Sequence, residues 1–462
     1  MFCPVKLPFL NRTEERARLR EVLRAGEPAL AIVYGRRRCG KSTLLQHVVQ
    51  PGDVYFLADQ REALLQIQAF ASAVDRIVPG FAAATYASWD RLFTALTARA
   101  RDRLNVFIDE FPYLVQSAPE LPSIIQRFID QPGPKTVSWV LCGSSQRMMQ
   151  GAALDRTAPL YGRAQAILKI RPLRAGWIAD ALGLEAREAV TAYAAWGGVP
   201  RYWELARAYG TTADALNALA LERDGVLHDE PQRLLQEDMR SAVQAYSLLS
   251  LIGVGCHRLS ELAARLGKPA GSLTRPLSNL IELGYVRKDS PWGETVRATK
   301  RTLHVIADPF LRFYFRFVVP NQSLLELGET GMVRRAVKDG MAAHIAAVWE
   351  DLARESVSFC DIGGRAWRPA SRWWGPGTHG HTLEFDVVAE SEDREAILIG
   401  EAKWSRARSD PARLAADLAA RSQHLPFVGK RVVVHALWLP EAGATRAAAH
   451  VVGPDRVLRA LR

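Results

Sequence analysis

The stretch ALAIVYGRRRCGKSTLLQHVV at residues 29–49 decides how the first third of the chain is expected to fold. Residues 29–35 are a continuous apolar run, which is typical of a strand buried on both faces of a parallel sheet. The octapeptide GRRRCGKS at 35–42 follows directly, and KSTLLQHVV opens a helix. A glycine-rich turn at this place aims backbone N–H groups and the positive end of the helix at one point. The pattern therefore predicts a site that binds nucleotide phosphates.

The side chains of this loop have distinct predicted roles in holding ATP and Mg²⁺, the two cofactors that the pattern indicates. Lys41 is expected to bridge the β- and γ-phosphates, and the hydroxyl of Ser42 is expected to ligate Mg²⁺. The arginines of the loop either help to hold phosphates or only make its rim basic. The other residues predicted to contact the nucleotide are Gly35, Arg36, Arg37, Arg38, Cys39, Gly40 and Thr43.

A second apolar run, VFIDE at 106–110, ends in two carboxylates. Asp109 is predicted to hold Mg²⁺ through water, and Glu110 is predicted to polarise the water that attacks the γ-phosphate. An acidic pair after an apolar run is often only the end of a strand. Its position downstream of a phosphate loop favours the catalytic interpretation.

Two further places in the first domain are candidates for contact with the γ-phosphate. Ser144 and Ser145 end the next expected strand, where they either sense this phosphate or cap the following helix. Arg163, in the segment PLYGR, is either an arginine that stabilises charge during hydrolysis or a solvated side chain. The sequence leaves both alternatives open, as it does whether Arg163 acts on its own subunit or on a neighbour.

Apolar runs and helical patterns alternate through residues 1–173, which predicts an α/β domain with a doubly wound parallel sheet. The expected strands are 29–35, 54–59, 105–110, 138–145 and 166–173, and the expected helices are 14–25, 60–78 and 119–130. Residues 174–240 then follow a helical pattern. In this segment WGGVP at 196–200 is expected to separate two helices.

Residues 241–319 have the pattern of a winged helix-turn-helix. Helices are expected at 246–252, 260–266 and 272–283, followed by a hairpin of YVRKD and TLHVI. The last helix carries a single prominent cation, Arg275, whereas the wing side is richer: Arg287, Lys288, Arg297, Lys300 and Arg301. The pattern leaves open whether the wing contacts DNA phosphates or the module packs against protein.

A final α/β segment is expected over 320–462, after a linker at PNQS. Its predicted elements are helices 340–357 and 410–422 and strands 383–389, 396–403 and 430–438. Asp386 lies on one strand, and Glu401 and Lys403 lie on one face of the next, because side chains alternate along a strand. They offer two carboxylates for a divalent metal, and an ammonium that activates water or stabilises a phosphorane.

Tryptophans and arginines alternate in this segment, where they either form a nucleic-acid surface or belong to the core and its cover. They are Trp367, Trp373, Trp374 and Trp404 with Arg365, Arg368 and Arg372. The formal net charge of +11 favours a polyanionic partner such as DNA, although a generally basic proteome gives the same surplus. Scattered cysteines, and the lack of a signal-peptide layout or a membrane-spanning run, predict a cytoplasmic protein without membrane association.

Several segments resemble the archaeal-type P-loop ATPases, a family related to the AAA+ and STAND groups. They are FLNRTEERARL (9–19), VYGRRRCGKSTLL (33–45), FIDEFPYL (107–114), LCGSSQRMM (141–149), PLYGR (159–163), GGVPRY (197–202) and IADPFLRFYFRFVVP (306–320). The resemblance covers almost the whole chain. One departure is Cys39, where a small aliphatic residue is more usual in the family.

The C-terminal extension of this family resembles restriction-endonuclease-like PD-(D/E)xK domains, to which LEFDVVAES and LIGEAKW are similar. This resemblance implies that Glu350, Asp386 and Glu401 are metal ligands and that Lys403 is catalytic. The fold class that follows is α/β: a P-loop NTPase domain (1–173), a helical lid (174–240), a winged helix (241–319) and a restriction-endonuclease-like domain (320–462).

The predicted function is a Mg²⁺-dependent ATPase acting with DNA, in which hydrolysis drives the winged helix and a nuclease-like domain. One alternative is a STAND-like switch whose C-terminal domain binds without cleaving, working as a homo-oligomer or with a protein partner. Another is a DNA-binding regulator that uses the winged helix.

Overall fold

The computed structural model describes residues 7–25, 27–100, 103–131, 137–239, 241–294, 301–378, 380–405, 410–441 and 449–462. The chain forms two compact units. The N-terminal unit contains Phe9–Pro172 and Glu237–Met239, and the second contains Leu173–Gln236 and Arg240–Arg462. Residues 174–240, 241–319 and 320–462, predicted as separate domains, thus lie almost entirely within the second unit.

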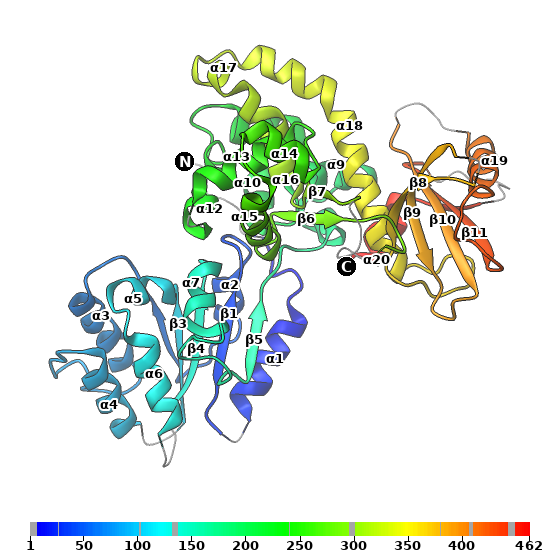
Figure 1. Ribbon diagram of the computed structural model, residues 1–462. Coiled ribbons are helices and arrows are strands. Elements are labelled where there is room, and N and C mark those ends of the chain that lie inside the picture. Colours follow the sequence, from blue (N-terminus) through cyan, green and yellow to red (C-terminus); the bar gives the residue numbers. More distant parts are fainter. Residues whose placement is uncertain are drawn as a thin grey trace. The chain divides into compact units, whose positions relative to one another are not determined.

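The N-terminal unit is built on a five-stranded sheet in the order β2-β3-β4-β1-β5 (Figure 1). Its strands are β1 (Leu30–Tyr34), β2 (Val54–Leu57), β3 (Leu104–Asp109), β4 (Val137–Gly143) and β5 (Ala166–Lys169). Every pairing is parallel, so all five carboxyl ends meet at one edge of the sheet. The five predicted strands and the parallel sheet are confirmed.

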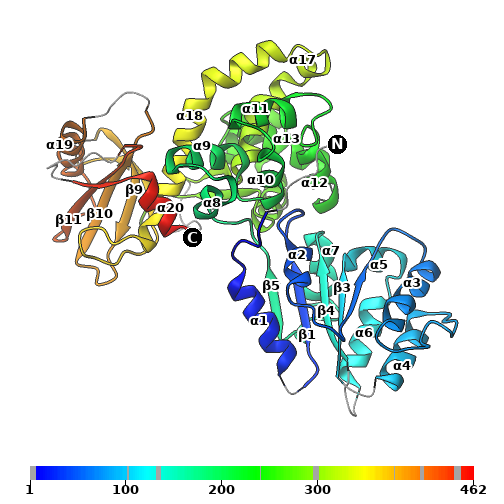
Figure 2. The same ribbon diagram turned by 180° about the vertical axis from the view of Figure 1, so that it is seen from behind.

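Helices lie on both faces of this sheet (Figures 1 and 2). They are α1 (Thr13–Arg24), α2 (Lys41–Gln46), α3 (Ala63–Asp75), α4 (Trp89–Arg99), α5 (Phe111–Ser117), α6 (Leu121–Asp130) and α7 (Gln146–Met149). The core beneath α3 and α4 is aromatic: Phe70, Trp89, Phe93 and Trp139 are each at most 2% exposed. Large apolar side chains of this kind dominate the burial that holds such a layer together.

The second unit begins with short helices. They are α8 (Ile178–Leu182), α9 (Ala186–Trp196), α10 (Pro200–Ala206), α11 (Thr212–Leu216) and α12 (Glu230–Asp238), whose last residues belong to the N-terminal unit. Gly197 and Gly198 separate α9 from α10, as predicted. A Cβ at Gly198 would lie 2.0 Å from the carbonyl oxygen of Leu173, so the close approach requires glycine.

The predicted helix-turn-helix and its hairpin are confirmed. The elements are α13 (Ala242–Gly253), α14 (Leu259–Leu266), α15 (Ala270–Glu282), β6 (Val286–Asp289) and β7 (Leu303–Ile306). Leu273, Leu277 and Leu280 form the buried stripe of α15, at the spacing of one helix face. Strands β6 and β7 pair antiparallel.

The predicted linker PNQS is wrong, because this segment is helical. Residues 309–326 run through α16 (Pro309–Phe313), one π-helical turn, one 3₁₀ turn and α17 (Gln322–Glu326). Pro320 occupies the first turn of the 3₁₀ segment, where a missing N–H does no harm. The Asn321 side chain donates to the carbonyl oxygen of Phe317 (2.8 Å) and Leu325 is fully buried. Polar turn residues therefore continue a helix that is anchored by one apolar side chain.

The C-terminal part contains a sheet in the order β12-β11-β10-β9-β8. Its elements are α18 (Thr330–Ser356), β8 (Ser371–Pro376), β9 (Thr382–Glu390), β10 (Ala396–Ala402), α19 (Pro411–Ser422), β11 (Val432–Trp438), β12 (His450–Val452) and α20 (Pro454–Ala460). Strands β8, β9 and β10 are antiparallel, and β10, β11 and β12 are parallel. Helices α18 and α19 both pack against this sheet.

Several features of this part differ from the prediction. Strands β8 and β12 and helix α20 were not predicted. Strand β12 has three residues, which is too short for a visible alternation. Trp367 and Trp373 are at most 4% exposed, so these two tryptophans are core residues and not a nucleic-acid surface. Within the described ranges, no helix is long and apolar enough to cross a membrane.

Candidate functional sites

The phosphate loop lies between β1 and α2 and has the backbone conformation that its glycines allow. Gly35 has φ +149°, and a Cβ there would lie 2.2 Å from the carbonyl oxygen of Ile170. Gly40 has φ +87°, and the space where its Cβ would point is open. Lys41 is 5% exposed, and its Nζ donates to the carbonyl oxygen of Arg36 (3.1 Å). An open loop with an ammonium folded over it fits a nucleotide phosphate.

The carboxylate of Asp109 is fully buried at the end of β3 and is held from two sides. Its Oδ1 accepts the main-chain N–H of Glu110 (3.0 Å), and its Oδ2 accepts the hydroxyl of Tyr55 on β2 (2.8 Å). Burial and the neighbouring Asp109 raise the pKa of Tyr55, so the phenol stays a hydrogen-bond donor. The Cys142 thiol lies on the other side, and burial raises its pKa well above the usual value. Tyr55 was not predicted.

The two serines after β4 have different roles. Ser145 caps α7 by accepting the N–H of Met148. Ser144 donates from its Oγ to Oε2 of Glu110 (2.9 Å), and Glu110 has a left-handed backbone (φ +54°) that turns it toward β4. Ser145 is therefore a helix cap, whereas the role of Ser144 at the γ-phosphate stays a prediction. Ser144 is placed beside the candidate catalytic carboxylate.

Two charged groups outside the loop hold it in place, and neither was predicted. Arg12 donates to the carbonyl oxygens of Cys39 (3.2 Å) and Arg171 (2.5 Å) and is 7% exposed. The second group is Glu237 at the end of α12, which forms an ion pair with Arg37 of the loop. Cys39, the departure from the family pattern, is fully buried.

Arg163 is not brought to the phosphate loop within its own chain. It precedes β5, and Gln165 beside it pairs with Leu30, the first residue of β1. The loop follows the last residue of β1, so a whole strand of about 16 Å separates the two places. Arg163 forms an ion pair with Asp130 (Nη2 to Oδ2, 2.7 Å).

The wing is docked against the C-terminal sheet. The main-chain N–H of Trp292 donates to the carbonyl oxygen of Arg372 (2.9 Å), and its ring lies 4.9 Å from that of Phe427. Arg301 forms an ion pair with Glu294 and donates to the carbonyl oxygen of Trp374. Trp292 and Arg301 therefore pack the hairpin against protein. Arg297 and Lys300 lie outside the described residues.

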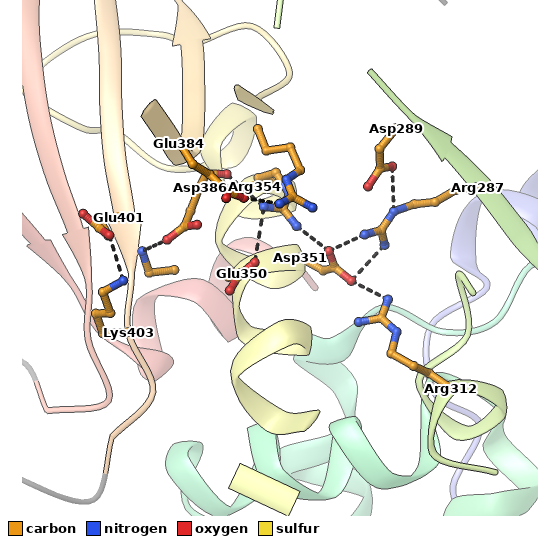
Figure 3. Close-up of polar contacts among 12 residues, drawn as sticks. Arg287, Asp289, Arg312, Glu350, Asp351, Arg354, Glu384, Asp386, Glu401 and Lys403 are labelled. Carbon is orange, nitrogen blue, oxygen red and sulfur yellow. Dashed lines mark hydrogen bonds and ion pairs between the residues drawn. The ribbon is translucent and has the colours of Figure 1, made fainter. Parts of the chain in front are cut away.

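The predicted C-terminal site residues come together only in part (Figure 3). Glu350 on α18 and Asp386 on β9 lie close enough for the charge of Asp386 to raise the pKa of Glu350, after burial, to about 7. Burial likewise raises the pKa of Asp386, whose Oδ2 accepts the N–H of Ala402 (3.0 Å). Figure 3 draws this pair beside the Arg354 guanidinium.

Glu401 is occupied by cations. Its Oε1 accepts Nζ of Lys403 (2.7 Å), and its Oε2 pairs with Arg421 of α19. Strand β10 ends at Ala402, so Lys403 follows the strand instead of lying on it, yet it still meets Glu401 as predicted. In the described ranges, no group of three His, Cys, Asp or Glu residues is arranged to hold a metal ion. The structure therefore offers Glu350 and Asp386 as an available pair, with Glu401 engaged nearby.

Three family models match parts of this chain. Residues 9–205 match a family described as an ATPase domain predominantly from Archaea. These residues support an archaeal-type P-loop ATPase. Residues 253–290 match the IclR helix-turn-helix domain, and residues 314–414 match a family of archaeal and bacterial proteins of unknown function.

Individual proteins are also similar to this chain. An uncharacterized protein of Methanocaldococcus jannaschii is 29% identical over 450 residues, which cover 92% of this chain and 96% of that protein. A Walker-type ATPase of Pyrococcus abyssi has a TM-score of 0.52 at 19% identity and covers 66% of this chain and 95% of its own. The ORC2 protein of Aeropyrum pernix has a TM-score of 0.46 at 16% identity, and the match covers 71% of this chain and 97% of ORC2.

These comparisons support nucleotide binding and ATP hydrolysis by the N-terminal unit. The individual roles of the ATPase's site residues stay predictions. Sequence reasoning missed Arg12, Tyr55 and Glu237 for different reasons. Arg12 lies in the segment FLNRTEERARL, which offered a signal, whereas Tyr55 and Glu237 belong to no motif and become visible only through their contacts.

Proposed function

We propose that this chain is a Mg²⁺-dependent ATPase that acts with DNA and uses hydrolysis to control a nuclease-like C-terminal domain. The observation that carries the ATPase part is the meeting of β3, β4 and β1 at one sheet edge. These neighbouring strands deliver Asp109 and Glu110, Ser144, and the phosphate loop to the same place. Carboxyl ends of parallel strands are where such folds bind ligands.

The position of each residue of the ATP site supports a proposed role. When bound, ATP supplies the phosphoanhydride bond that water cleaves to give ADP and inorganic phosphate. Lys41, which donates to the carbonyl of Arg36, would bind the β- and γ-phosphates, and Ser42 and Asp109 would hold Mg²⁺. Glu110 orients the attacking water and receives its proton. Ser144 fixes the direction of the Glu110 carboxylate through the hydrogen bond between its Oγ and Oε2.

Two substitutions separate nucleotide binding from hydrolysis. Lys41→Ala should lose ATP affinity and hydrolysis, whereas Glu110→Gln should bind ATP and hydrolyse it at least about a hundredfold more slowly. The exposed residues Lys430 and Glu120 supply matched controls, Lys430→Ala and Glu120→Gln. If Lys41→Ala hydrolyses ATP as fast as the parent, the proposed site is wrong.

The nuclease-like part is supported by the Glu350–Asp386 pair on α18 and β9. Burial and the charge of Asp386 raise the pKa of Glu350, and two half-buried carboxylates this close favour a bound divalent cation, which would relieve their repulsion. Glu401 on β10 and Lys403 just after this strand lie beside the pair. The pair would hold Mg²⁺ or Mn²⁺ at a phosphodiester, and the Lys403 ammonium would stabilise the phosphorane.

A plasmid assay tests this proposal. Supercoiled DNA is incubated with Mg²⁺ or Mn²⁺, with and without ATP, and nicking is followed on gels. Parent protein should nick, and Asp386→Ala should not, while Asp361→Ala removes an exposed carboxylate from the same unit as a control. Lys41→Ala, compared with parent protein in the ATP arm, shows whether hydrolysis and cleavage are coupled.

The second candidate is an ATP-controlled switch, of the STAND type, whose C-terminal domain binds without cutting. It is favoured by one observation: Arg421 and Lys403 both occupy Glu401, a predicted metal ligand. In that case no metal would support nicking, while DNA would still stimulate ATP hydrolysis.

A further inference from the structure

A cavity of about 430 Å³ lies beside the Glu350–Asp386 pair. Arg354 connects the two, because it lines the cavity while its Nη1 donates to the carbonyl oxygen of Asp386 (2.9 Å) and lies 4.0 Å from Glu350. The walls come from β6, from α18 and from the start of β8 (Figure 3 shows the first two).

The charged groups that line this cavity carry a positive surplus. Four are basic and three are acidic: Arg287, Lys288, Arg354 and Arg372 against Asp289, Asp351 and Glu355. Burial raises the pKa of Glu355, one of the three acidic groups. A cavity of this charge favours an anion over a cation.

Asp351 holds two guanidinium groups of this wall, those of Arg287 and Arg354, in fixed positions, and also pairs with Arg312 behind the wall. Its carboxylate accepts from Arg287 (2.5 Å), Arg312 (2.7 Å) and Arg354 (2.5 Å), which come from β6, α16 and α18. These three cations keep the pKa of Asp351 well below its usual range although the group is buried. A ligand that binds these guanidinium groups need not order them first, which saves conformational entropy.

The cations of the cavity retain donors for a ligand. A guanidinium has five N–H groups. In the described part of the chain, the hydrogen bonds of Arg287 use three of them and those of Arg354 use two. Among the described residues, Lys288 forms no ion pair. Arg372 forms one ion pair, with Glu384.

We propose that this cavity binds a backbone phosphate of a nucleic-acid strand and places the adjoining phosphodiester at the Glu350–Asp386 pair. The proposal rests on the nuclease-like function proposed above. Guanidinium forks suit phosphate oxygens in geometry and charge, and backbone contacts of this kind set the register of a strand without reading its bases. All of the lining residues lie within the second unit.

The test measures binding of a fluorescent DNA duplex by anisotropy, in EDTA, over a series of KCl concentrations. Lys288→Gln and Arg372→Gln each remove one cavity cation and leave Asp351 and its three arginines intact. Each should weaken binding and reduce the slope of log K against log salt by about 0.9 for each phosphate that is no longer neutralised. Lys430→Gln and Arg394→Gln remove exposed cations outside the cavity and should keep the parent slope. Thermal unfolding curves show that each variant is folded.

Unchanged affinity and slope in both cavity variants would overturn the proposal. Competition by inorganic phosphate in the millimolar range, together with an unchanged DNA slope, would assign the cavity to a free anion and also overturn it. Reduced slopes together with no nicking under any metal would keep the phosphate site and reject the nuclease. Slopes equal to that of the parent in both cavity variants, together with nicking that Asp386→Ala abolishes, would reject the phosphate site and keep the nuclease.

Discussion

Asp109 depends on a tyrosine that no motif contains. Tyr55 lies on β2, which pairs with β3 so that Leu57 is opposite Asp109. The hydroxyl of Tyr55 donates to the Asp109 carboxylate. The carboxylate predicted to hold Mg²⁺ is therefore oriented by a residue of the neighbouring strand.

Tyr55→Phe should reduce kcat for ATP hydrolysis and raise the Mg²⁺ concentration needed for half-maximal rate. The substitution removes only the hydroxyl, so Asp109 loses a donor that fixes its direction. The accompanying loss of stability should be about 1 kcal/mol. Steady-state rates over a Mg²⁺ titration provide the measurement.

Tyr86→Phe is the matched control for this prediction. The Tyr86 hydroxyl donates to the carbonyl oxygen of Phe81 (2.9 Å) and is buried away from Asp109. Both variants should lose similar stability, but Tyr86→Phe should keep the Mg²⁺ dependence of the parent. Identical kinetics in the two variants would show that Tyr55 is only structural.

Helix α18 organises the second unit. It begins at Thr330, ten residues before the predicted start, and its 27 residues carry Glu350, Asp351 and Arg354 toward the sheet. The early turns were missed because Gly331 and Gly340 weaken the helical pattern. Gly340 is required by packing, since a Cβ there would lie 2.5 Å from the ring of Phe317.

His344 on α18 makes this unit sensitive to acid. It is fully buried, its ring nitrogen Nε2 lies 2.7 Å from the carbonyl oxygen of Ala194, and burial lowers its pKa from 6.5 to about 3. Between these values the unfolded chain binds a proton that the folded chain excludes. The contribution of His344 to the free energy of unfolding is therefore fully present above pH 6.5. It falls as the pH drops, by about 2 kcal/mol at pH 5.

Urea unfolding at pH 7.5 and pH 5 checks this expectation. The parent protein and His344→Asn are compared, because other groups titrate in both proteins and cancel in the difference. The stability gap between them should shrink by about 2 kcal/mol at pH 5. A gap that does not change with pH would contradict the assignment.

The wing serves as a packing element. Trp292 contacts Phe427, and the Arg431 guanidinium lies 5.6 Å from its ring. Trp292→Ala should destabilise the second unit by about 2 kcal/mol, less than the loss for a fully buried tryptophan, because this ring is half-buried. Denaturant midpoints measure the effect. Leu327→Ala, at a side chain that is 78% exposed, should change them by less than about 0.5 kcal/mol.

At the scale of the whole molecule, chain topology assigns Arg163 to the sheet edge opposite the phosphate loop. The parallel order of the strands makes this separation unavoidable, since Arg163 precedes β5 and the loop follows β1. We therefore expect any contribution of Arg163 to hydrolysis to act on a second copy of the chain.

A mixing experiment tests action between copies. Arg163→Ala and Glu110→Gln are each expected to hydrolyse ATP slowly. Their equimolar mixture should recover part of the parent rate, because some sites combine an intact Glu110 with an intact Arg163 from the neighbour. If Arg163→Ala alone hydrolyses ATP at the parent rate, its role is limited to the surface ion pair with Asp130, which stabilises by at most about 1 kcal/mol.

The sequence by itself determined the parts whose rules are local. The phosphate loop between β1 and α2, the strand that ends at Asp109 and the helix-turn-helix follow from glycine positions, apolar runs and helical spacing over a few residues. Asp386, Glu401 and Lys403 were found in the same way, by alternation along two strands. Backbone conformation and side-chain period act between neighbours, so they leave a readable pattern.

Tertiary structure alone decided which of these groups are available. Arg421 occupies Glu401 from twenty residues away, Tyr55 holds Asp109 across two strands, and Asp351 gathers arginines from three elements. The wing packs instead of standing free, and Arg163 faces away from its own loop. Contacts between residues distant in sequence follow no period, because they depend on how apolar faces bury one another and on which charges burial brings together.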